Sequence, residues 1–150
     1  FLGSGGKIEV FGTERALQRW IAGDGAEGHD LTAASTWQEV VSRAESDLDI
    51  TVDAMNSYVL AELDEDLAEG TTSVDPGRLE LATELLLDVG EWAGDDEPRT
   101  ALAESQPLGW LVSFIVRPDP TRLAPSPPFT AESAKLGELI DELEDRLNQH

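Results

Sequence analysis

The 150-residue chain is long enough for one folded domain with a sizeable core, and 40% of its residues are apolar, which argues against disorder. It carries 31 acidic against 10 basic side chains, a formal net charge of −21, and such a field repels phosphates. We therefore expect no direct binding to nucleic acid and none to anionic membranes. The absence of cysteine excludes disulfides, thiolate catalysis and cysteine-based metal sites, and it favours a cytoplasmic protein.

The chain begins with phenylalanine and not with methionine, so we expect that it is truncated or processed at its N-terminus. Residues 1–2 and 7–11 flank the glycine-rich stretch 3–6, which predicts a β-hairpin whose first strand is cut short. Thr13 is placed to cap a helix over 14–22. The glycine-rich stretch matches neither phosphate-binding fingerprint, so a turn is the expected structure.

Three helices are predicted in the middle of the chain. Thr36 and Glu39 fit a capping box that opens a helix through Ala44 and turns Trp37 inward. A longer helix is predicted over 52–69, because apolar residues recur there at spacings of three and four. Its apolar stripe consists of Val52, Met55, Val59, Leu60, Leu63 and Leu67. Asp75 and Pro76 then form an N-cap followed by proline, which starts a helix with a wide apolar face that we expect to be central to the core.

The C-terminal third contains an apolar run, a proline-rich stretch and a terminal helix. The short length, β-branched residues and Gly/Pro borders of 110–116 favour a buried strand paired with 7–11, with a helix as the alternative. Five prolines in 118–128 predict an extended surface segment. Thr130 is expected to cap a helix whose apolar stripe is Leu136, Leu139, Ile140, Leu143 and Leu147.

These elements predict an α+β fold that is dominated by five or six helices. Its small sheet of two or three strands would join 7–11 to 110–116 and include the truncated first strand. We expect a compact domain over 1–129. Residues 130–150 would form a C-terminal helix that packs on this domain or on a partner, including a second copy of the chain.

His29 is the only internal histidine, and Asp30 follows it directly. The pair would be the first place to look for a ligand-binding or catalytic site, but it also fits a turn before the next helix. The other histidine, His150, is terminal, and no G-x-S-x-G motif accompanies the pair. We therefore predict no catalytic residues, no metal site and no cofactor.

The densest acidic run lies within the helix predicted over 52–69. Its members are Glu62, Asp64, Glu65, Asp66 and Glu69. The EF-hand spacing is missing, so the run is either a solvated helix face or a surface for a basic partner.

A resemblance is carried by three stretches of the first forty residues. They are Phe1-Leu2-Gly3, Val10-Phe11 with Leu17, and His29-Asp30-Leu31 with Trp37. In these stretches the chain resembles an uncharacterised group of actinobacterial proteins that often carry the label "primosomal protein". The label implies a role in DNA replication, whereas the net charge argues against direct contact with DNA. The resemblance implies no active site.

Three functions follow as hypotheses. The first is a non-enzymatic domain that acts through protein–protein contact, by its acidic helix face or by self-association of its terminal helix. The second is a small-ligand binder or enzyme with a site around His29 and Asp30. The third is an acidic nucleic-acid mimic that binds a basic protein.

Overall fold

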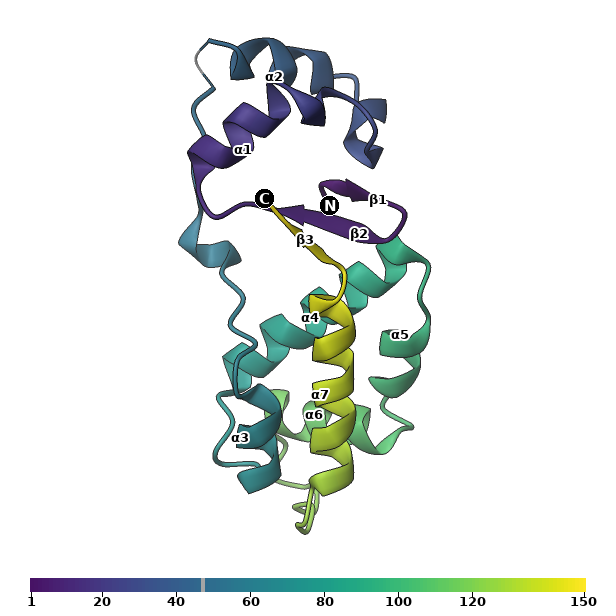
Figure 1. Cartoon of the computed structure of the whole chain (residues 1–150). Coiled ribbons are helices and arrows are strands. Elements are labelled where there is room, and N and C mark those ends of the chain that lie inside the picture. Colours follow the sequence, from purple (N-terminus) through teal and green to yellow (C-terminus); the bar gives the residue numbers. More distant parts are fainter. Residues whose placement is uncertain (47) are drawn as a thin grey trace. The chain divides into compact units, whose positions relative to one another are not determined.

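The structure is a computed structural model that describes residues 1–46 and 48–150. The chain forms two compact units: unit 1 comprises 1–56 with 146–150, and unit 2 comprises 57–145. The described residues hold seven α-helices and one three-stranded sheet (Figure 1). The predicted helix-dominated α+β fold is therefore confirmed, with one or two helices more than expected.

Unit 1 contains the sheet, with strand order β1-β2-β3. Strand β1 (Gly3–Ser4) is antiparallel to β2 (Lys7–Val10), and β3 (Leu147–Gln149) is parallel to β2. Between β1 and β2, Gly5 and Gly6 have φ angles of 57° and 76°, both in the left-handed region. Two such residues are what a tight hairpin turn requires, so the predicted hairpin is present.

The third strand does not come from the segment that the sequence suggested. Leu147 pairs with Ile8, and the Ile8 N–H donates to the carbonyl of Arg146 at 2.8 Å. Leu147 was predicted to continue the stripe of the terminal helix, but that helix ends at Glu144. A three-residue edge strand with the sequence Leu-Asn-Gln has neither the length nor the alternation that would predict a strand.

The helical part of unit 1 consists of α1 (Glu14–Ile21) and α2 (Trp37–Ala44), with the 3₁₀ turns η1 (Asp24–Ala26) and η2 (Asp30–Ala33) between them. Figure 1 shows both helices on the same side of the sheet. Their apolar faces meet in a small core. It consists of Ile21, Trp37 and Ala44, with Leu2, Leu17, Trp20, Ala22, Val40, Val41 and Leu48 packed against them.

Only one of the two predicted caps in unit 1 forms. The hydroxyl of Thr13, whose backbone is extended, accepts a hydrogen bond from the Ala16 N–H at 3.1 Å, as predicted. Thr36 makes no such bond, so the capping box is a wrong prediction. Its backbone is already helical, whereas a cap needs an extended conformation to direct its side chain at the first N–H groups. Trp37 is buried as predicted, with 6% of its surface exposed.

Unit 2 is a bundle of five helices: α3 (Leu63–Glu69), α4 (Pro76–Ala93), α5 (Glu97–Ala101), α6 (Pro107–Val116) and α7 (Thr130–Glu144). Helix α7 packs against α3, α4 and α6, and α4 also packs against α5 and α6. The largest fully buried side chains all belong to this unit. They are Leu63, Leu67, Leu79, Leu86, Leu111, Leu136 and Leu139.

The start of α4 follows the sequence prediction, and the start of α7 does not. The carboxylate of Asp75 accepts from the Arg78 N–H at 2.8 Å, and Pro76 occupies the first helical turn. In α7, Thr130 is the first helical residue, and Phe129 stands at the cap position without a side-chain hydrogen bond. The proline-rich segment 118–128 contains neither helix nor strand.

The apolar run 110–116 was predicted as a strand and is the body of α6, which is a correction. Helix α6 contacts α4, α5 and α7, and Leu108, Leu111 and Ile115 are buried. A helix that is apolar around most of its circumference shows no single stripe, so its pattern resembles that of a buried strand. Pro107 at the first helical turn was the available signal for a helix.

The prediction of one helix over 52–69 is also wrong for most of that range. Only α3 is helical, preceded by a single 3₁₀ turn, η3 (Ala54–Asn56). Glu62, immediately before α3, has φ 61° and ψ 9°, a left-handed conformation that interrupts any continuous helix. The apolar residues before this break have no helix to hold them against a core.

Candidate functional site

His29 lies in unit 1, immediately before η2, and its ring is buried with 6% exposure. Its Nε2 lies 2.9 Å from the carbonyl oxygen of Gly25, so Nε2 is the nitrogen that donates. The ring meets Trp37 edge-on at 4.5 Å between centroids and lies 5.7 Å from the ring of Trp20. The imidazole therefore takes part in aromatic packing.

The two residues of the predicted dyad have different surroundings. His29 Nδ1 is buried and has no hydrogen-bond partner among the described residues, whereas the side chain of Asp30 is exposed. Within residues 1–46 and 48–150, no group of three or more His, Asp or Glu side chains is arranged to hold a metal ion. A ligand site at His29 and Asp30 stays a prediction that no observation tests.

The acidic run at the start of unit 2 divides into two groups. The side chains of Glu62, Glu65 and Glu69 are exposed, and none of them forms a hydrogen bond or ion pair with a described residue. Asp64 and Asp66 are half-buried. Helical geometry explains this division, because α3 turns Leu63 and Leu67 into the core and the residues beside them lie at its edge.

Asp64 and Asp66 contact the rest of unit 2. Asp66 pairs with Arg78 at 3.3 Å, with 30% and 34% of the two side chains exposed, and Arg78 also donates to the carbonyl of Ala61 at 2.7 Å. The carboxylate of Asp64 lies over Gly137, where an added Cβ would stand 2.9 Å from its Oδ2. The fold therefore uses two of the five predicted binding carboxylates.

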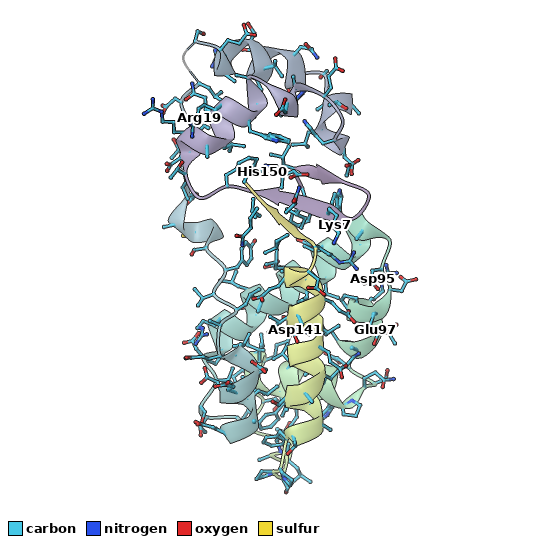
Figure 2. All side chains as sticks on the ribbon, viewed as in Figure 1. Lys7, Arg19, Asp95, Glu97, Asp141 and His150 are labelled. Carbon is cyan, nitrogen blue, oxygen red and sulfur yellow. The ribbon has the colours of Figure 1, made fainter. Side chains whose placement is uncertain are left out.

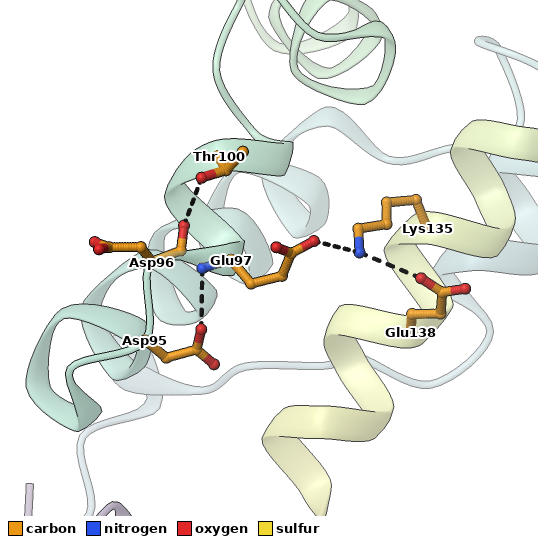
Figure 3. A network of polar contacts seen from close by, with 6 residues as sticks. All are labelled: Asp95, Asp96, Glu97, Thr100, Lys135 and Glu138. Carbon is orange, nitrogen blue, oxygen red and sulfur yellow. Dashed lines mark hydrogen bonds and ion pairs between the residues drawn. The ribbon is translucent and has the colours of Figure 1, made fainter.

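A polar network that sequence reasoning missed connects α5 to α7 (Figure 3). Lys135 Nζ lies 2.6 Å from the Glu97 carboxylate and 3.3 Å from that of Glu138. The pKa of Lys135 is raised, first because its ammonium donates to Glu97; desolvation opposes this, and Glu138 adds to it. The pair with Glu138 is at i,i+3 and readable from the sequence, but the contact with Glu97 depends on helix packing.

Beside this network lies a cavity of about 280 Å³ between α5 and the first turns of α6 and α7. Ala101, Pro107, Leu108 and Ala131 form its apolar wall, and Glu132 is among its polar lining. Figure 2 shows how many oxygen-tipped side chains surround the helices, among them Glu97 on α5 and Asp141 on α7. The cavity lining thus combines the acidic Glu97 and Glu132 with the basic Lys135 and the neutral Thr100 and Gln106.

Four exposed apolar side chains lie within residues 52–59, in and around η3 and before α3. The exposed fractions are 73% for Val52, 83% for Met55, 41% for Tyr58 and 54% for Val59. The sequence pattern predicted three of these residues as a buried stripe, so their exposure is a correction with a bearing on function. None of the helices in the described part of the chain has the length and apolar character needed to cross a membrane.

Comparisons with known proteins identify a family. A model of the SatS C-terminal domain matches residues 1–148. A solved structure described as the crystal structure of the SatS C-terminal domain in complex with bromine is 38% identical, with a TM-score of 0.90. The match covers 100% of this chain and 80% of that one. A search of curated proteins finds no match. The resemblance to proteins labelled primosomal stays a prediction.

Proposed function

This chain belongs to the SatS C-terminal domain family. We propose that it is a non-enzymatic domain that binds a basic protein partner through three exposed carboxylates, that of Glu62 immediately before α3 and those of Glu65 and Glu69 on α3. The observation that carries the proposal is the division of the acidic run. Glu62, Glu65 and Glu69 serve no contact inside the described part of the chain, so their charges are available to a partner. The net charge of −21 would speed the encounter with a basic surface.

Self-association through the terminal helix is the less supported form of this proposal. The stripe that would form a dimer seam is already buried in unit 2, with Leu136, Leu139, Ile140 and Leu143 at 0%, 1%, 7% and 5% exposure. Two copies would also repel each other, because each carries a large negative charge. The cytoplasmic location predicted from the lack of cysteine belongs to the proposal as well.

The test is a variant, called the α3 triple, in which glutamine replaces the three exposed glutamates at and just before α3: Glu62→Gln, Glu65→Gln and Glu69→Gln. A protein captured from extract of the source cells would be purified, and its affinity for the full chain measured at low and moderate salt. Three rim charges at roughly 0.2–1 kcal/mol each predict a loss in affinity of about 3- to 150-fold, smaller at higher salt.

A matched control removes the same charge from another helix. Asp141, Glu142 and Glu144 on α7 are exposed, and substituting Asp141→Asn, Glu142→Gln and Glu144→Gln changes the net charge equally. We expect this control to retain most of the affinity. Equal losses in both triples would show that only the overall field matters, and no loss in the α3 triple would refute the proposal.

Two alternatives have tests of their own. If the chain is a nucleic-acid mimic, duplex DNA should displace it from the captured protein, and the displacement should weaken steeply with salt. The second alternative is a ligand site at His29, and the buried Nδ1 without a partner is the observation that favours it. In that case, His29→Ala should abolish a ligand-induced rise in melting temperature while the protein without ligand stays folded.

A further inference from the structure

The segment 52–62, called here the linking segment, carries several large apolar side chains that are exposed to solvent. Val52, Met55 and Val59 are each more than half exposed, and Tyr58 is 41% exposed. Single exposed apolar side chains are ordinary, but four of them within eight residues of one segment make that segment a candidate for contact with a partner.

The spacing of these residues suits a helix that is absent from the structure. Val52, Met55 and Val59 stand at i, i+3 and i+7, on one side of a helix with 3.6 residues per turn. In such a helix the stripe would be in register with Leu63 of α3. Asp53 would lie on one flank of it, and Glu62 with the rest of the acidic α3 face would lie on the other.

The linking segment also contains one feature that starts a helix and another that keeps this helix from joining α3. At the start, the carboxylate of Asp53 accepts from the Met55 N–H at 2.9 Å, as an N-cap does, and η3 forms one turn there. At the other end, Glu62 is the only non-glycine residue with positive φ in the described part of the chain. Its left-handed conformation costs free energy that a continuous helix would recover.

The composition of the linking segment explains why it stays non-helical alone. Val52, Ser57 and Val59 have low helix propensity, and a short helix without tertiary contacts is marginal in water. A partner that covers the apolar stripe would supply the missing contacts.

We propose that residues 54–62 fold into a helix continuous with α3 when they dock on a partner protein that offers an apolar groove with a basic rim. Met55 and Val59 would enter the groove, while Asp53 and Glu62 would face the rim. A second copy of this chain is a poor occupant, because its own charge of −21 supplies no basic rim. The inference rests on the proposed function and adds to it an apolar contact and a folding step.

The experiment uses the full chain and a synthetic amphipathic peptide of leucine and lysine, which presents an apolar stripe between cationic flanks. A peptide with glutamate in place of lysine is the charge control. Binding is measured by anisotropy of the labelled peptide, and folding by amide hydrogen exchange. We expect the lysine peptide to slow exchange at 54–62, and the glutamate peptide to leave exchange there unchanged.

Two pairs of variants test the docking and the folding step separately. For docking, Met55→Ser with Val59→Ser should weaken binding by about tenfold or more, whereas Leu123→Ser, at an apolar residue that is 89% exposed elsewhere, should leave it unchanged. For folding, Glu62→Ala and Glu62→Gly remove the same charge, but alanine favours the helix and glycine the left-handed break. The alanine variant should bind at least about fivefold more tightly than the glycine variant.

Any of three results would overturn the inference: no protection at 54–62, equal affinities of the two Glu62 variants, or equal losses at Leu123 and at the Met55 and Val59 pair. The proposed function fails separately, if neutralising Glu62, Glu65 and Glu69 leaves binding to the captured protein intact. Loss in that triple without protection at 54–62 would keep the proposed function and reject the folding step.

Discussion

Replacing Asp66 by asparagine should destabilise unit 2, although it removes one negative charge from a chain with a large excess of them. Asn is nearly isosteric with Asp, so the substitution removes the charge and little else. It leaves the Arg78 guanidinium without its carboxylate at 3.3 Å, in a place where only about a third of each side chain is exposed. The neighbouring Glu65→Gln is the matched control, because that side chain is exposed and unpaired among the described residues.

The structure sets the size of the effect. A fully exposed pair contributes about 0–1 kcal/mol, and a hydrogen bond to a charged group about 1.5–3 kcal/mol. The Asp66–Arg78 pair is intermediate, and Arg78 keeps its bond to the carbonyl of Ala61. We therefore expect a loss of about 1–2 kcal/mol for Asp66→Asn, and a change within about 0.5 kcal/mol for Glu65→Gln.

Thermal and urea unfolding followed by far-UV circular dichroism would measure both variants. A loss of this size lowers the melting temperature by roughly 2–8 °C for a chain of this length. A double-mutant cycle with Arg78→Gln would isolate the coupling of the pair. Equal stability of Asp66→Asn and Glu65→Gln, or a coupling energy near zero, would refute the conclusion that Asp66 stabilises the fold. Asp66 would then count among the carboxylates that are available to a partner.

Two further predictions concern helix packing in unit 2. At Gly109 in α6 an added Cβ would stand 2.1 and 2.4 Å from two backbone carbonyl oxygens, so Gly109→Ala should lower the free energy of unfolding by about 2 kcal/mol. The control Gly12→Ala should change it little, because an added Cβ there meets open space. Equal effects of the two substitutions would contradict this packing. Lys135→Met should cost about 0.5–1 kcal/mol by removing the contact with Glu97. Because the folded-state pKa of Lys135 is raised, its contribution is complete below its usual value of 10.5 and lost as the pH rises through the folded-state value. The stability difference from wild type should therefore hold from about pH 7 to pH 10 and shrink above that; a difference that falls between pH 7 and 9 would rule out this account.

The sequence alone determined the features that depend on neighbouring residues. The Gly5-Gly6 turn, the Thr13 cap and the Asp75-Pro76 helix start were all readable, because each depends on backbone conformations and hydrogen bonds within a few residues. The helix-dominated α+β class followed from the same local signals. The acidic run was also visible as the place where binding charges could lie.

Tertiary structure alone decided which residues share a contact. The run 110–116 is a helix because α4, α5 and α7 surround it, and the third strand is C-terminal because Leu147 meets Ile8 across the length of the chain. The same reasoning applies to the candidate site, where packing of α3 against Arg78 and Gly137 assigns two of its five carboxylates to the fold. Periodicity shows which side of an element is apolar, but only the packed neighbours determine whether that side is covered, which is why the apolar stripe of the linking segment is exposed and that of α7 is buried.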